Sequence, residues 1–410
     1  MLYIEQISRV NKVPLEAYDN ASIEEAELQE KVAKEIRQFV DSPIAFLSHG
    51  TQQKEDNVMQ QILDRLASVT PLDMAAMELA RSRQQQLTKP AGSLGRLEDI
   101  AIQMAGITGQ LLPHIKQKSV IIMAADHGIT REGVSAYPAD VTPQMVYNFL
   151  RGGAAINALA HHAGAKVIVV DVGVAADISH PGLLSRKVAF GTANMAQEPA
   201  MSQTQMLEAI QVGIDVCDAQ LDQGIDLIAT GDMGIGNTTA SSAIASVLLQ
   251  KPAGLVTGRG TGIDDVQLAH KIEVIEKAIE RHVPNSQDPL DVLMKVGGLE
   301  IAGLVGVIVA ATSRRTPVVI DGFISGAAAL VAMELNPLIG AYLFAGHVSV
   351  EQGHRLILER LGLSPLLDLR LRLGEGTGAV LAMSIIEAAL CAHREMATFA
   401  EAGVSTREEK

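Results

Sequence analysis

Short runs of consecutive apolar residues alternate with longer amphipathic stretches along most of the chain. The clearest run, residues 120–125 (VIIMAA), contains no polar residue, which is typical of a strand buried on both faces of a sheet. Similar runs predict further strands at 166–173, 225–230, 317–320 and 342–345. Because helix-like stretches separate these runs, the pattern predicts an α/β fold with a mostly parallel, Rossmann-like sheet flanked by helices.

The helix-like stretches place apolar residues on one face or are apolar throughout. They predict helices at 24–40, 74–86, 97–107, 144–150, 153–163, 203–220, 264–282, 296–312, 324–334, 351–361 and 379–392. After the first of these, Ser42-Pro43 and the segment 49–51 (HGT) are interpreted as helix breaks. We therefore interpret residues 1–70 as an N-terminal extension, either an arm on the main body or an oligomer contact, without chemistry of its own. The polar end of the chain, from Ala400, is expected to fray.

Composition restricts the possible functions. Of the 410 residues, 48% are hydrophobic but only 3% are aromatic, so the core consists of aliphatic side chains packed closely around 36 glycines. The net charge of −14 argues against nonspecific binding to nucleic acid or to a membrane surface. The two cysteines, Cys217 and Cys391, have no metal-binding spacing and fit a reducing cytoplasm. The longest apolar run, 301–312, is too short to span a bilayer.

Polar residues follow the predicted strands, at the edge where open parallel sheets bind their ligands. Asp126-His127-Gly128 follows the first strand, and Asp321-Gly322 follows the strand at 317–320. An aspartate and a histidine can bind a metal ion, but further ligands at suitable spacing are missing from the sequence. We therefore predict no metal site, and a hydrogen-bonded structural pair is the preferred interpretation.

Two glycine-rich loops carry the strongest binding signal. The segment 231–241 (GDMGIGNTTAS) joins a strand directly to a helix, so its backbone N–H groups converge at a helix start, with hydroxyl groups beside them. It matches neither the Walker nor the dinucleotide fingerprint. A cradle for phosphate or carboxylate is predicted here, with a capped tight turn as the alternative. After the second loop, 258–262 (GRGTG), Lys271 either points back at a bound anion or lies on the helix surface.

The segment 374–379 (GEGTGA) places Glu375 between two glycines at the start of a helix. A helix start offers free N–H donors and a partial positive charge, which normally keep a carboxylate ionised. Glu375 is therefore predicted to act as a base rather than as an acid. The alternative is a glycine-rich turn whose glutamate only caps the helix.

Six motifs in this order resemble those of one enzyme family: KPAGSLGRLE, ADHG, GDMGIGNTTAS, KVGGLEIAG, DGFIS and RLGEGTGA. Each is weak alone, but their order and spacing together are specific. The chain resembles the nicotinate-nucleotide:dimethylbenzimidazole phosphoribosyltransferases, which make the lower-ligand nucleotide of cobalamin. The resemblance covers roughly residues 70 to 396, and the N-terminal extension lies outside it.

The resemblance implies a homodimeric enzyme whose substrates are nicotinate mononucleotide and a benzimidazole base. We expect no cofactor, and the cytoplasmic location rests on the cysteines. The resemblance implies transfer of 5-phosphoribose to the base, which gives α-ribazole 5′-phosphate and nicotinate. It also implies a smaller helical domain built from both ends of the chain. We expect this domain at 71–110 and 350–396, the nucleotide-binding core at 111–349 and a polar tail at 397–410.

The resemblance assigns roles to individual residues. Glu375 corresponds to the catalytic base, and Asp232 to a second acid that is often glutamate in the family. The residue after that acid, Met233, belongs to the base pocket, and two polar pocket positions align with Tyr137 and Met145. The phosphate-binding positions, together with the predicted cradle, are Gly234, Gly236, Asn237, Thr238, Gly260, Lys271 and Ser349.

The expected chemistry agrees with these assignments. The ring nitrogen of nicotinate mononucleotide is already cationic, so nicotinate leaves without a general acid. A glutamate near its normal pKa of ~4.3 is ionised at pH 7 and can accept the benzimidazole proton. An ionised Asp232 would stabilise positive charge on the ribose. Two alternatives are the same fold with another acceptor (adenine, another benzimidazole or a phenol) and a non-catalytic nucleotide-binding module.

Overall fold

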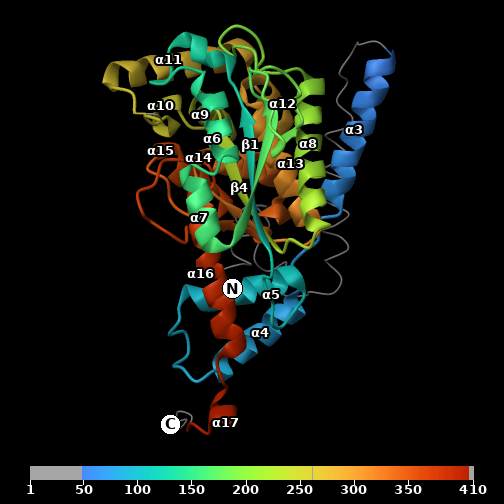
Figure 1. Ribbon diagram of the computed structural model, residues 1–410, viewed down its shortest axis with the longest axis vertical. Helices are drawn as coiled ribbons and strands as arrows, with labels where there is room; N and C mark the ends of the chain where they lie inside the picture. The colour runs from blue at the N-terminus through green and yellow to red at the C-terminus, as the bar shows by residue number, and fades with distance from the viewer. Residues whose placement is uncertain (1–48, 261, 406–410) are drawn as a thin grey trace.

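A parallel sheet forms the centre of the protein (Figure 1). The computed structural model describes residues 49–260 and 262–405. Within them, the strands are β1 (Lys118–Ala125), β2 (Ala165–Gly173), β3 (Leu183–Ser185), β4 (Leu227–Met233), β5 (Val318–Ile320) and β6 (Leu343–Ala345). Their order is β3-β2-β1-β4-β5-β6, and every neighbouring pair is parallel. The strand order reverses between β1 and β4, and open parallel sheets bind their ligands at such a point. The parallel sheet with flanking helices confirms the predicted Rossmann-like α/β fold.

The central strands extend further than their apolar runs. β1 is buried along its whole length and pairs with both β2 and β4. β4 continues into the glycine loop, because Gly231, Asp232 and Met233 pair with residues 122–124 of β1. The backbone hydrogen bonds to β1 therefore keep residues 231–233 in the strand, although the glycine and polar side chains there predicted a loop. β3 was not predicted, since three residues are too few to show a pattern.

Helices cover the sheet, most of them in the predicted positions, although the helices at 253–256 and 289–296 were not predicted. In Figure 1, α6 (Val141–Leu150) and α7 (Ala155–Ala163) lie in front of the sheet, and α13 (Leu299–Ser313) lies behind it, against α8 (Gln203–Leu221). The other elements of this body are η2 (Gly128–Glu132), α9 (Asn237–Leu248), α10 (Ala253–Val256), α11 (Asp265–His282), α12 (Pro289–Val296), α14 (Phe323–Leu335), η3 (Pro337–Tyr342) and α15 (Gln352–Leu361). The single helix expected at 296–312 is therefore α13, preceded by the separate α12. In the described residues, every helix is too short or too polar to cross a bilayer.

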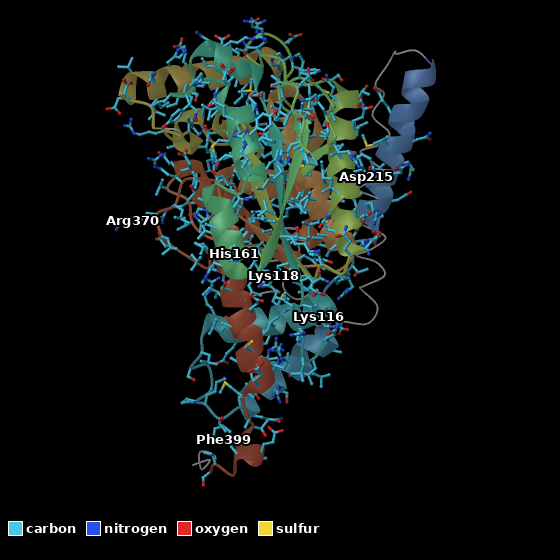
Figure 2. All side chains as sticks on the ribbon, viewed as in Figure 1. Lys116, Lys118, His161, Asp215, Arg370 and Phe399 are labelled. Carbon is cyan, nitrogen blue, oxygen red and sulfur yellow. The ribbon has the colours of Figure 1, made fainter. Side chains whose placement is uncertain are left out.

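Segments from both ends of the sequence meet below the sheet. There α4 (Met74–Gln86) and α5 (Arg96–Thr108) pack beside α16 (Thr377–Glu395), and α17 (Phe399–Ala402) follows (Figure 1). Gln84 Nε2 lies 2.9 Å from His393 Nδ1, so α4 and α16 also share a buried polar contact. Figure 2 labels Lys118, which lies at the start of β1. Its Nζ pairs with Glu387 Oε2 of α16 at 2.5 Å. α16 thus joins this helical region to the sheet, while α15 packs on α14. The domain boundaries stay a prediction.

Two interpretations of the chain ends were wrong. A helix, α3 (His49–Ala67), begins at the segment that we interpreted as a break. Gly50 and Thr51 occupy its first turn, where residues of low helix propensity cost little, and Ile62 and Leu66 are buried further along it. At the other end, Thr398 and Glu401 form a capping box that starts α17, so residues 400–402 are helical. The helix expected at 24–40 lies outside the described residues.

Glycines allow the helices α8 and α13 to cross at close range. A Cβ atom at Gly213 would lie 1.9 Å from the carbonyl oxygen of Gly303, and one at Gly306 would lie 1.9 Å from that of Ile210. Neither backbone has room for a side chain. α13 also lies close to β1, since a Cβ atom at Gly303 would lie 3.1 Å from Met123 Sδ, and Glu300 in its first turn contacts His127 after β1.

We expect Gly213→Ala to destabilise the protein by about 1–3 kcal/mol, because the added methyl group overpacks the crossing of α8 and α13. The measurement is the midpoint of urea unfolding followed by circular dichroism. Gly254→Ala is the matched control, since a Cβ atom at Gly254 would meet open space. Equal midpoints for the two variants would contradict the close crossing.

Candidate active site

Three consecutive residues at the start of α16 have left-handed backbone conformations. The φ angles are +79° at Gly374, +64° at Glu375 and +93° at Gly376. Glu375 is the only one with a side chain, and a non-glycine residue in this region costs roughly 1 kcal/mol or more. The turn rests on the end of β4, because a Cβ atom at Gly231 would lie 2.5 Å from the carbonyl oxygen of Glu375. Surrounding contacts must therefore hold Glu375 in this conformation.

The Glu375 side chain points into the protein rather than into solvent. It is 4% exposed, and its Oε2 accepts the backbone N–H of Ile156 at 3.2 Å. Ile156 is the second residue of α7. A helix N-terminus does contact this carboxylate, as expected, but it is the N-terminus of α7. The alternative interpretation, that Glu375 only caps α16, was wrong, because the carboxylate contacts α7 and the start of α16 has no side-chain cap hydrogen bond.

The pKa of Glu375 differs from our expectation of a normal value. Burial raises the pKa, and the negative charge of Asp321 raises it further, whereas the N–H of Ile156 opposes the shift. Burial prevails because one backbone donor replaces only part of the lost hydration. A glutamate with a raised pKa is a stronger base, provided that it remains deprotonated at the working pH.

Asp232 lies beside this turn, at the end of β4. Its Oδ2 accepts a hydrogen bond from Asn237 Nδ2 at 3.0 Å and would lie 3.2 Å from a Cβ atom on Gly374. Burial raises its pKa well above the usual value, and the charges of Asp321, Glu300 and Glu375 add to the effect. Among the described residues, neither Asp232 nor Glu375 has a cationic partner within 4.0 Å. Two buried carboxylates without a cation beside them therefore favour a ligand that carries positive charge.

The predicted anion-binding residues converge at a second cluster. Lys271 is 1% exposed, and its Nζ donates to Thr238 Oγ1 at 2.8 Å. Gly260 has a φ of +50°, and a Cβ atom there would lie 2.8 Å from Thr238 Oγ1 and 3.3 Å from Lys271 Nζ. The interpretation of Lys271 as a surface lysine was wrong, because α11 turns this side chain inward toward α9.

A buried glutamate that we did not predict completes this cluster. Glu351 Oε1 accepts the N–H of Gly260 at 2.9 Å, and the N–H of Glu351 points to Ser349 Oγ at 3.3 Å. Burial lowers the pKa of Lys271 to about 8, although Glu351 opposes the shift. In the sequence, Glu351 looked like the first residue of a helix, and no motif marked it. Its contact with Gly260 spans 91 positions and depends on the tertiary fold.

The two clusters meet at the start of α9. Asn237 contacts Asp232, and the next residue, Thr238, contacts Lys271. Gly236 caps this helix with a φ of +99°, and a Cβ atom on Gly234 would lie 2.3 Å from the carbonyl oxygen of Ala125. The segment 231–241 thus links the buried carboxylate of Asp232 to the Lys271 cluster.

The predicted base-pocket residues are less closely grouped. Met233 is half-buried at the end of β4, next to Asp232 in the chain. Tyr137 is 54% exposed in the loop before α6, and Met145 is half-buried on α6 against the core. Their roles in binding a base stay predictions.

Asp126 and His127, which we interpreted as a hydrogen-bonded pair, each contact another residue instead. His127 Nε2 lies 2.7 Å from Glu300 Oε1, and both side chains are buried. Burial alone lowers the pKa of His127, but the charge of Glu300 outweighs it and raises the pKa. Asp126 Oδ2 accepts the N–H of Ala175 at 2.8 Å. Across the described ranges, no group of three or more His, Cys, Asp or Glu residues is arranged to hold a metal ion.

Comparison with known proteins defines the class of enzyme. The family model DBI_PRT, described as a phosphoribosyltransferase, matches residues 69–404. The chain is therefore a phosphoribosyltransferase.

Individual relatives define the family more narrowly. The nicotinate-nucleotide–dimethylbenzimidazole phosphoribosyltransferase of Chloroflexus aggregans is 61% identical over 352 residues, which cover 86% of this chain and 100% of the relative. The enzyme of that name from Geobacter sulfurreducens is 55% identical over 85% of this chain and 99% of its own length. The crystal structure of CobT from Thermus thermophilus has a TM-score of 0.79 and 48% identity, covering 81% of this chain and 99% of that chain. The chain belongs to the nicotinate-nucleotide–dimethylbenzimidazole phosphoribosyltransferase family.

If the Lys271 cluster binds an anion, affinity for inorganic phosphate should fall as the pH rises through about 8, because Lys271 loses its charge there. Lys271→Met should weaken binding at pH 7 and abolish this loss. Lys277→Met is the matched control, because Lys277 lies on the same helix, is exposed and pairs with Glu273. Isothermal titration calorimetry between pH 6.5 and 9.5 measures both effects. Equal phosphate affinities of the two variants would remove Lys271 from the anion site.

Proposed function

We propose that this chain transfers the 5-phosphoribosyl group of nicotinate mononucleotide to 5,6-dimethylbenzimidazole, giving α-ribazole 5′-phosphate and nicotinate. The named relatives support the substrates, since the chain covers their whole length at more than half identity. The observation that carries the proposal is the position of two buried carboxylates, Glu375 and Asp232, beside the cluster of Lys271, Thr238 and Gly260.

Glu375 is the general base in this proposal. One benzimidazole nitrogen attacks C1 of the ribose, and the bonding electrons of the old glycosidic bond return to the pyridinium ring. The ring nitrogen of nicotinate leaves neutral, so the departing group needs no proton. Glu375 takes the proton from the other benzimidazole nitrogen, a step in which positioned bases typically contribute about 10²–10⁴-fold. Attack opposite to the leaving group converts a β-glycosidic bond into an α one.

Asp232 serves as an electrostatic partner of the ribose. Its pKa is raised in the free protein because burial and three neighbouring carboxylates disfavour its charged form. A cationic nicotinate ring or an oxocarbenium-like ribose would reverse this effect and favour ionisation of Asp232. The negative charge on Asp232 would then increase as positive charge develops on the ribose. An interaction that is stronger in the transition state than in the ground state is what lowers the barrier.

The second cluster holds the phosphate as a remote handle. Lys271 supplies a cation, Thr238 a hydroxyl group and the 231–241 loop the N–H groups of a helix start. Binding the phosphate there would place C1 of the ribose beside the two carboxylates, which lowers the entropic part of the barrier. We assign this role to Gly234, Gly236, Asn237, Thr238, Gly260, Lys271 and Ser349, and we assign Met233 to the acceptor pocket.

A homodimer and a cytoplasmic location complete the proposal. Cys217 is buried and Cys391 is exposed, and both are free, which fits a reducing compartment. Light scattering of the purified full chain tests the dimer, and a mass of one chain would reject it.

The test of the function is a nicotinate-release assay with the full chain. Nicotinate should appear from nicotinate mononucleotide only when 5,6-dimethylbenzimidazole is added. Parallel reactions with adenine and with a phenol test other acceptors, and a higher kcat/KM for either one would replace the proposed acceptor. Nucleotide binding without release for any acceptor would leave only the non-catalytic interpretation.

Glu375→Gln should lower kcat by at least about 10²-fold, since the amide cannot accept the proton, while nucleotide affinity changes little. In the unsubstituted chain, kcat/KM should fall on the acid side at a higher pH than an ordinary glutamate would give, because the pKa of Glu375 is raised. Steady-state kinetics between pH 5 and 9 measure both. Glu395→Gln, near the other end of α16, is the control. Near-normal turnover of Glu375→Gln would remove Glu375 from the base role.

A further inference from the structure

Asp321 connects the end of β5 to the turn that carries Glu375. This side chain is fully buried, with 0% exposure. Its Oδ1 accepts the N–H of Ala379 at 2.9 Å, and its Oδ2 accepts the N–H of Gly376 at 3.2 Å. Both donors belong to the start of α16, where N–H groups have no partner within the helix. One carboxylate therefore satisfies two donors within the four residues that follow Glu375.

Asp321 also lies close to a histidine from the loop after β6. His347 Nε2 lies 3.7 Å from Asp321 Oδ1, and its ring packs against α16, since a Cβ atom on Gly378 would lie 1.9 Å from His347 Cδ2. Gly346 makes a similar approach, because a Cβ atom there would lie 2.7 Å from the Cα of Ala379. These contacts leave Asp321 little freedom to move away from the turn.

The turn needs such support because its conformation is strained. Glu375 has a left-handed backbone between two left-handed glycines, a state that persists only when its surroundings impose it. Thr377 stabilises the turn from within, because its N–H and its hydroxyl both donate to the carbonyl oxygen of Gly374, at 3.1 and 2.9 Å. Asp321 connects the turn to the sheet by accepting the N–H groups of Gly376 and Ala379.

We propose that Asp321 is a positioning residue for the reaction, which holds the 374–376 turn against the sheet so that the Glu375 carboxylate faces the reacting atoms. This inference rests on the proposed role of Glu375 as the base. Asp321 itself touches backbone N–H groups and makes no contact that requires a substrate.

The charge of Asp321 predicts an effect on the pH dependence of kcat/KM that a loss of stability would not produce. The acidic groups that act on this region are Asp232 from β4, Asp321 from β5 and Glu300 from α13, and His347 faces Asp321 from the loop after β6. Of these, the charge of Asp321 raises the pKa of Glu375. Removal of that charge should therefore move the acid limb of kcat/KM to lower pH, whereas a general loss of stability should not.

The first test needs no substitution. In the unsubstituted full chain, the amide protons of Gly376 and Ala379 should exchange slowly with deuterium, as measured by NMR. The first turn of an exposed helix usually exchanges fast, because its N–H groups bond to water. Fast exchange at both positions would overturn the proposal, whether or not the chain proves to be active.

The second test is Asp321→Asn, whose amide keeps one acceptor but turns an NH₂ group toward the other N–H. We expect kcat to fall at least about tenfold, KM for nicotinate mononucleotide to change less than about threefold, and the acid limb to move to lower pH. Asp171→Asn is the matched control, because Asp171 is also a buried strand-end aspartate but accepts the N–H of Val174 instead. This control should leave the acid limb in place.

The outcomes separate the two proposals. If the unsubstituted chain releases no nicotinate, the proposed function fails, and the amide exchange still decides whether Asp321 holds the turn. If the unsubstituted chain is active but Asp321→Asn keeps its kcat and its acid limb, the positioning role fails alone. If Asp321→Asn does not fold, slow amide exchange in the unsubstituted chain supports the role, and fast exchange overturns it.

Discussion

The burial of several carboxylates at one edge of the sheet is the constraint on which the site depends. Asp232, Glu375 and Asp321 are each less than 5% exposed, and Glu300 reaches the same region from α13. Burying like charges together is costly unless some are protonated or a cation joins them. The protein offsets part of this cost with hydrogen bonds from Asn237, Ile156 and the start of α16. The remaining imbalance is what a cationic substrate can relieve, so the same burial that costs stability favours binding.

Glycines make this arrangement possible by bringing backbones into contact. Gly231 admits the carbonyl oxygen of Glu375, and Gly374 leaves space beside Asp232. A similar close approach at Gly303 lets α13, with Glu300 in its first turn, lie against Met123 of β1. The chain contains few aromatic side chains, and its elements are correspondingly closely spaced. Dense packing lets charges on separate elements act on one another.

Much of the fold could be predicted from the sequence because buried parallel strands appear as continuous apolar runs. The motif around Glu375 could also be identified, since glycines at a helix start mark a special backbone. The direction of its pKa shift could not, because burial depends on α7 and β5, which are distant in the sequence. Glu351 and the His127–Glu300 pair were missed for the same reason: their partners lie 91 and 173 positions away. Sequence patterns show which residues are unusual, but tertiary contacts decide what those residues touch.

The helix α16 connects the site to the helical region below the sheet. The strained 374–376 segment directly precedes its first turn, and its last turns contact α5 and α4. Gln84 of α4 contacts His393, and Arg83 donates to the carbonyl oxygens of residues 393, 394 and 396. One helix therefore runs from segments that are distant in the sequence to the turn that places Glu375 at the edge of the sheet.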